Sequence, residues 1–79
     1  MNAVYEHLTL LLTEKFEVPA PEIRPDATLT DLDLDSLAVA ELFLTLQEHW
    51  SVPLEDDSTA AALTLTEVTD RITTMRLAD

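Results

Sequence analysis

Apolar residues recur at three- and four-residue steps in three parts of the chain, the spacing that places them on one face of an α-helix. The first helix is expected near the N-terminus, where Asn2 is positioned to cap it. It should end by about residue 17 or 18, because Pro19 and Pro21 follow. Its apolar stripe consists of Val4, Leu8, Leu11, Leu12 and Phe16.

A second helix is predicted from Ser36 to about Trp50, with Asp35 as its N-cap and Pro53 closing the segment. Placing successive residues 100° apart separates two faces of this helix. The face expected to meet the core carries Val39, Leu42, Phe43, Leu46 and Trp50. The opposite face carries Leu37, Glu41, Leu44 and Glu48.

The C-terminal third of the chain begins with an acidic cluster, Glu55 to Asp57, and residues 58–62 suit a short helix or a helical turn. The last helix has a start signal in residues 64–67, where Thr64 and Glu67 have the spacing of a capping box. Its apolar stripe and the two arginines that favour its C-terminal half are Leu65, Val68, Ile72, Met75, Arg71 and Arg76.

Residues 18–35 contain three prolines and no sustained period, which predicts a long loop between the first two helices. Ile23, Leu29 and Leu32 are expected to anchor this loop on the core. No segment has a β-strand period and no internal repeat is present. The pattern predicts a single all-α domain over residues 1–79, a small four-helix bundle of three main helices plus one short helix with a long first loop. Long loops in compact domains tend to be functional.

Charge and composition narrow the classes of function. Sixteen acidic residues against four basic ones give a formal net charge of −12. Such a field repels nucleic-acid phosphates and anionic membrane surfaces, and it attracts proteins with basic patches. The apolar run at residues 10–12 is short and lies between Glu6 and Glu14, unlike a signal peptide or a membrane span. We therefore expect a cytoplasmic protein that binds neither nucleic acid nor membrane.

The chain contains no glycine and no cysteine. Phosphate-cradling loops and the nucleophile elbow of hydrolases need glycine where the backbone turns sharply or approaches a ligand. Without cysteine there is no disulfide framework and no thiolate metal site. These absences exclude the usual nucleotide sites and several classes of enzyme.

Residues 31–37 read Asp-Leu-Asp-Leu-Asp-Ser-Leu and run directly into the second predicted helix. At this point the chain resembles the acyl carrier proteins, whose Asp-Ser-Leu motif carries a 4′-phosphopantetheine arm on the serine. The resemblance extends over nearly the whole chain, because that family also has a long first loop and its serine at the start of the second helix. It implies that Ser36 is the attachment point and that the protein tethers acyl groups as thioesters without being an enzyme.

The same resemblance implies partners and a surface that meets them. A phosphopantetheinyl transferase would install the arm on Ser36. Acyltransferase, ketosynthase or ligase-type enzymes of fatty-acid or polyketide-type biosynthesis would dock through basic patches, and the carrier is expected to be a monomer. The residues assigned to this partner surface are Asp35, Leu37, Glu41, Leu44 and Glu48.

The same residues could suggest two other functions, a nucleophilic serine or a calcium-binding loop. A nucleophilic serine needs a base within hydrogen-bond reach, and His49 lies thirteen residues along the same predicted helix while His7 belongs to another. The alternating aspartates before Ser36 look like the opening of a calcium-binding loop. That loop needs glycine and glutamate at the positions that Ser36 and Leu42 hold here. No catalytic and no metal site is therefore predicted.

The chain departs from the carrier pattern in two places. Most carriers have glycine where Asp33 stands, so the backbone there is expected to adopt a left-handed conformation. The second helix is also less acidic than is common in fatty-acid carriers, which favours a specialised pathway at least as much as fatty-acid synthesis. Two alternatives stay open: an aminoacyl or peptidyl carrier of non-ribosomal synthesis or cell-wall modification, and an unmodified acidic helical adaptor.

Overall fold

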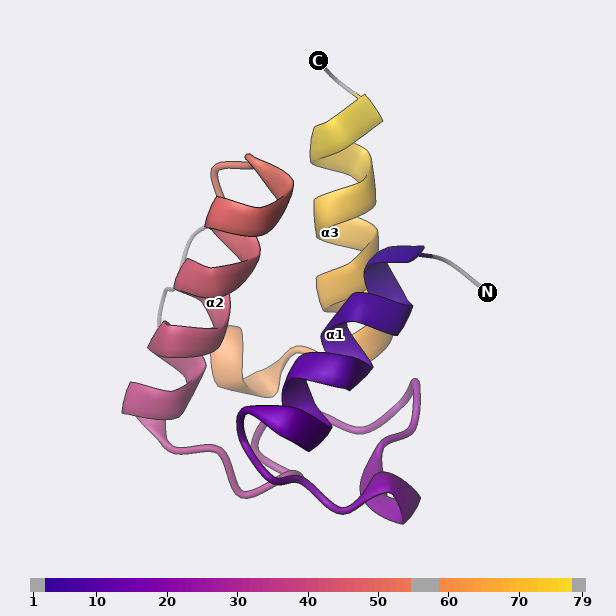
Figure 1. Ribbon diagram of the computed structural model, residues 1–79, viewed down its shortest axis with the longest axis vertical. Coiled ribbons are helices and arrows are strands. Elements are labelled where there is room, and N and C mark those ends of the chain that lie inside the picture. The colour runs from indigo at the N-terminus through magenta and orange to yellow at the C-terminus, as the bar shows by residue number, and fades with distance from the viewer. Residues whose placement is uncertain (1–2, 55–58, 78–79) are drawn as a thin grey trace.

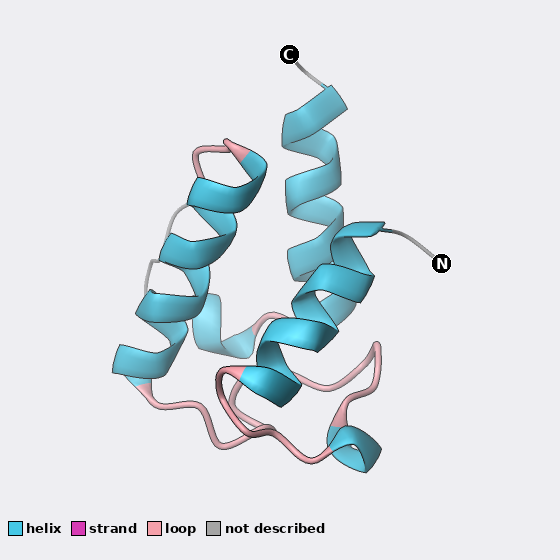
Figure 2. Cartoon of the chain, viewed as in Figure 1, coloured by secondary structure: helices cyan, strands magenta, loops and turns pink. Residues whose placement is uncertain are grey.

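A computed structural model describes residues 3–54 and 59–77 of the chain. Its body consists of three α-helices, α1 (Ala3–Glu14), α2 (Ser36–Trp50) and α3 (Leu65–Leu77), with two short 3-10 helices, η1 (Ala20–Glu22) and η2 (Ala60–Ala62). Within this described part there is no strand (Figure 2). The predicted all-α fold is confirmed, and η1 is an additional helical turn within the long first loop.

The arrangement places the two ends of α2 in different surroundings. In Figure 1, α1 and α3 lie together on one side and α2 stands on the other, with η2 running between α2 and α3. The long first loop passes beneath the helices and enters α2 at its lower end. The C-terminal ends of α2 and α3 point in the same direction, away from that loop.

Local signals in the sequence set the ends of the helices. Asp35 caps α2 as predicted, because its Oδ1 accepts a hydrogen bond of 2.8 Å from the Ala38 N–H. The helix ends at Ser51, which has a left-handed backbone with φ 54°. The capping box of α3 is also confirmed: the Thr64 N–H donates to the Glu67 carboxylate and the Glu67 N–H donates to the Thr64 hydroxyl.

The core is built from one face of each helix together with residues of the connecting segments. Of the five residues predicted on the core face of α2, Val39, Leu42, Phe43 and Leu46 are buried, whereas Trp50 is half-buried. The last helix contributes Leu65, Val68 and Ile72 as predicted, and α1 contributes Val4, Leu8 and Leu12. The apolar residues whose three- and four-residue spacing predicted the helices therefore also form the core.

The first loop is held in place by backbone hydrogen bonds to the segment that precedes α3. The Leu29 N–H donates to the Leu63 carbonyl at 3.2 Å, and the Leu65 N–H donates to the Ala27 carbonyl at 3.0 Å. Leu29 and Leu32 are buried, so both anchors are confirmed, and Ile23 is half-buried against the core. These bonds fix the path of the chain on its way to α2.

Some predictions lie outside the described residues, namely the cap at Asn2 and the acidic cluster Glu55 to Asp57. Among the helices that are described, none is long and apolar enough to cross a membrane.

Candidate functional site

Ser36 is the first residue of α2, and its side chain is exposed. Because Asp35 caps the third N–H of the helix, the direction in which α2 leaves the loop is fixed at the serine itself. Ser36 and the neighbouring Leu37 are therefore both exposed at the N-terminal end of a capped helix.

The backbone before Ser36 forms a tight, internally bonded approach. The Thr28 N–H donates to the Asp31 carboxylate at 3.1 Å, and the Asp31 N–H donates to the Thr28 hydroxyl at 3.0 Å. Asp33 follows with φ 61°, so the left-handed conformation expected at this position is confirmed. Asp31 and Asp35 thus use their carboxylates to shape the turn.

Among the described residues, no group of three or more histidine, aspartate or glutamate side chains is arranged to hold a metal ion. The aspartates are exposed and act as turn-forming and solvated groups.

The start of α2 suits a phosphate ester on Ser36. The first N–H groups of an α-helix have no partner within the helix, and Asp35 occupies only that of Ala38. These N–H groups and the helix dipole stabilise negative charge at this end. The carboxylates of Asp33 and Asp35 oppose it, although both are exposed and therefore screened by water. The exposed hydroxyl and the free N–H groups fit a phosphodiester.

Neither histidine can serve Ser36 as a base. His49 is near the other end of α2, about 20 Å from Ser36 along the helix axis. His7 is held at that same end, because its Nδ1 accepts a hydrogen bond of 3.0 Å from the Trp50 indole N–H. The chain has no other histidine. The exposed serine therefore has no imidazole to activate it as a nucleophile.

The surface opposite the core face of α2 is exposed along its whole length. We call it the docking stripe and define it as Leu37, Glu41, Leu44 and Glu48. Leu37 is 70% exposed and Leu44 is 55% exposed, values that are high for leucine. The stripe runs from Ser36 along about 16 Å of the helix, so only its first residues lie beside the serine. Asp35 stands at the start of the stripe, where its carboxylate is engaged as the helix cap.

The sequence did not predict the contacts at the far end of α2. His7 is half-buried and His49 is exposed, and their rings are stacked with centroids 3.8 Å apart. Trp50 packs against the core as predicted, but it is only half-buried and its indole N–H is also bonded to His7. The sequence does place His49 and Trp50 side by side at the end of α2. Their adjacency does not indicate which residue of α1 they contact.

Comparison with known proteins gives a consistent result. Residues 6–72 match the family described as the phosphopantetheine attachment site. The chain is 30% identical over 77 residues to the acyl carrier protein of Helicobacter pylori strain G27, covering 96% of this chain and 99% of that protein. It is 28% identical over 71 residues to the acyl carrier protein of Nitratidesulfovibrio vulgaris strain DP4, covering 89% and 93% respectively. No solved structure matches the chain.

Proposed function

The chain belongs to the acyl carrier protein family, and on that premise we propose that it tethers acyl groups as thioesters on a 4′-phosphopantetheine arm attached to Ser36. The observation that supports this most is the exposed serine at the first position of a capped helix, within the matched residues. The arm supplies the thiol that holds the acyl group. The protein supplies the attachment point, its orientation and a surface that partners recognise.

The residues around Ser36 suit this role because they position the serine without covering it. The Asp35 cap and the bonded turn before it hold the helix start in one conformation. Exposure of Ser36 lets a transferase reach the hydroxyl. A tethered acyl group then meets each partner enzyme at a raised effective concentration, which is the physical advantage of a carrier.

The thioester can be tested by loading the arm and acyl group together. Incubation with an acyl-coenzyme A and a promiscuous phosphopantetheinyl transferase should add one acylated arm per chain, measured as intact mass. Treatment with hydroxylamine at neutral pH should then remove the acyl group and leave the arm, because a thioester is cleaved and a phosphodiester is not. A chain that gains no mass would be the unmodified adaptor.

We propose that the docking stripe meets basic patches on partner enzymes of fatty-acid or polyketide-type biosynthesis. Two exposed leucines alternate with two exposed glutamates on one helix face, the combination of apolar anchor and charge found at interfaces. Glu41→Lys should slow acyl transfer by a basic partner by about tenfold at low ionic strength, because the steering charge is reversed. Transfer rates measured across a salt series should also become less dependent on salt.

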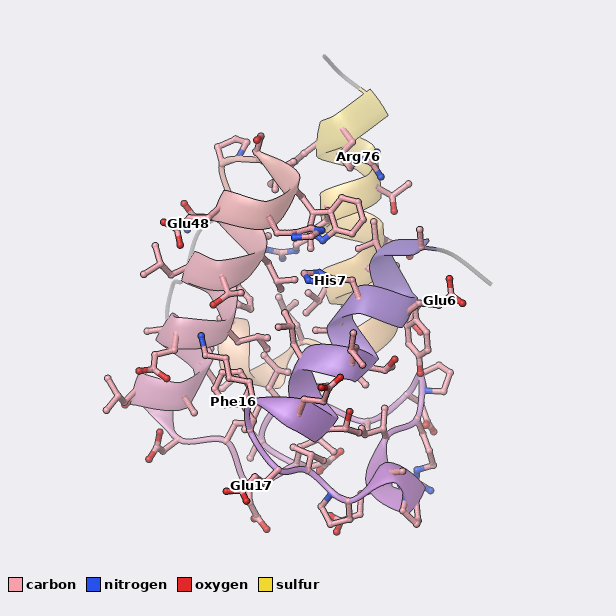
Figure 3. The ribbon with its side chains drawn as sticks, viewed as in Figure 1. Glu6, His7, Phe16, Glu17, Glu48 and Arg76 are labelled. Atoms are coloured by element: carbon pink, nitrogen blue, oxygen red, sulfur yellow. The ribbon has the colours of Figure 1, made fainter. Side chains whose placement is uncertain are left out.

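Glu6→Lys is the matched control for that substitution. It makes the same change of charge at an exposed glutamate of α1 that points away from α2 (Figure 3). This variant should keep most of the transfer rate, and neither variant should change the free energy of unfolding by more than about 0.5 kcal/mol. Equal slowing by both variants would mean that net charge alone matters, and no slowing by Glu41→Lys would move docking away from this stripe.

A loading assay separates acyl carriers from aminoacyl carriers. A ligase that loads amino acids and one that loads acyl groups can be offered the holo-protein in parallel. We propose that acyl loading is faster, as supported by the two compared relatives, both of which are acyl carrier proteins. Preferential aminoacyl loading would instead assign the chain to non-ribosomal synthesis or cell-wall modification.

A further inference from the structure

Three rings pack together between α1 and the C-terminal end of α2, and we call them the ring cluster: His7, His49 and Trp50. The imidazoles of His7 and His49 are stacked with an interplanar angle of 22°. Trp50 meets both edge-on, at centroid distances of 5.5 Å to His7 and 4.8 Å to His49. From α3, the guanidinium carbon of Arg76 lies 4.6 Å from the centroid of the Trp50 ring. The cluster therefore connects all three helices at the end away from Ser36.

The hydrogen bond within the cluster requires a neutral His7. An indole N–H can only donate, so the Nδ1 of His7 must accept and must carry no proton. A neutral imidazole that accepts at Nδ1 carries its proton on Nε2. Protonation adds an N–H at Nδ1, which would face the indole N–H and remove the bond between α1 and α2.

The charges that face the cluster do not favour a proton there. From α2 the facing titratable group is His49, and from α3 it is Arg76, a cation that approaches across Trp50. Glu6, beside His7 on α1, and Glu48, beside His49 on α2, both point away from the cluster (Figure 3). A proton on His7 would therefore add a positive charge against a second imidazole.

We propose that the ring cluster is a proton-sensitive latch, which ties α1 to the C-terminal end of α2 while His7 is neutral and releases it when His7 is protonated. The direction of the effect follows from linkage. Burial lowers the pKa of His7 below its ordinary value of 6.5, and the neighbouring His49 lowers it further. Because the released form binds the proton more readily, the latch is fully stable above about pH 6.5 and weakens as the pH falls through the lowered pKa.

The unmodified chain can test the latch without any partner or arm. Its two histidines can be titrated separately by NMR, and Trp50 is the only tryptophan, so its fluorescence reports on the cluster alone. The pKa of His7 should lie below 6.5. The Trp50 emission maximum should move to longer wavelength with the same midpoint, because release exposes the indole to water. Far-UV circular dichroism should show that the helices persist over this range.

Two substitutions separate the latch from ordinary packing. His7→Gln keeps an acceptor for the indole but does not titrate, so its emission maximum should stay constant between about pH 7.5 and pH 5.5. His49→Phe keeps a ring for stacking and removes the second imidazole, so the pKa of His7 should rise toward 6.5.

The latch would be overturned by a His7 pKa at or above 6.5 in the wild-type chain, or by an emission maximum that does not move with the His7 titration. An emission shift that persists with the same midpoint in His7→Gln would overturn it as well. If that variant does not fold, coincidence of the two wild-type midpoints still decides the question. Failure of the latch leaves the attachment at Ser36 untouched, since that site lies at the other end of α2.

Discussion

Leu46→Ala is expected to lower the free energy of unfolding by about 2–5 kcal/mol. Leu46 is fully buried in the C-terminal half of α2, within the core to which all three helices contribute. Truncation removes buried apolar surface and leaves a cavity that a small bundle fills only in part. A domain of this size has roughly 4–12 kcal/mol of stability in total, so the loss should shift the denaturant midpoint strongly or unfold the protein outright.

Leu44→Ala is the matched control, with the same change two residues away on the same helix. Leu44 is 55% exposed, so its truncation should change stability by about 0.5 kcal/mol or less, measured by the same denaturant titration. The two substitutions have equal effects on helix propensity, and any difference between them reports burial. Similar losses for both would contradict the assignment of the two faces of α2.

The two faces could be assigned from the sequence because helix geometry converts spacing directly into direction. The bounds of α2 also followed from local chemistry, since Asp35 is a short acceptor that caps a helix and Pro53 excludes continuation beyond the C-terminal end. The same reasoning placed the start of α3 at the Thr64 and Glu67 pair. Such signals act over three or four residues and need no knowledge of the rest of the fold.

The path of the first loop and the ring cluster could not be predicted in this way. The loop is fixed by bonds such as that from Leu29 to Leu63, whose partners are far apart in the sequence. His7 and Trp50 are likewise brought together only by the packing of α1 against α2. Periodicity states which face of a helix is apolar, but it does not state which residues of another helix will lie opposite.

The site itself was predictable to the extent that it is local. Asp35, Ser36 and Leu37 form one cap and helix start, and the resemblance to carriers with glycine at the position of Asp33 predicted its left-handed conformation. The docking stripe was also predictable as a surface, because exposure follows from the helical period. The partners of the stripe could not be predicted in this way, because they depend on a complementary surface in another protein.

Ser36→Ala is expected to abolish attachment of the arm completely, because it removes the only hydroxyl at the start of α2 while leaving the fold intact. Because Ser36 is exposed, its substitution should change the free energy of unfolding by about 0.5 kcal/mol or less. Ser51→Gly is the matched control: it removes an exposed hydroxyl at the other end of α2 and suits the left-handed backbone there. That variant should be modified like the wild type.

The intact mass of the chain after incubation with coenzyme A and a promiscuous phosphopantetheinyl transferase is the most direct test of the proposed carrier role. The wild type and Ser51→Gly should each gain one phosphopantetheine, and fragmentation of the wild type should place it on the peptide that contains Ser36. Ser36→Ala should keep its unmodified mass. A wild type that gains no mass, or a Ser36→Ala variant that still gains the arm, would contradict the assignment.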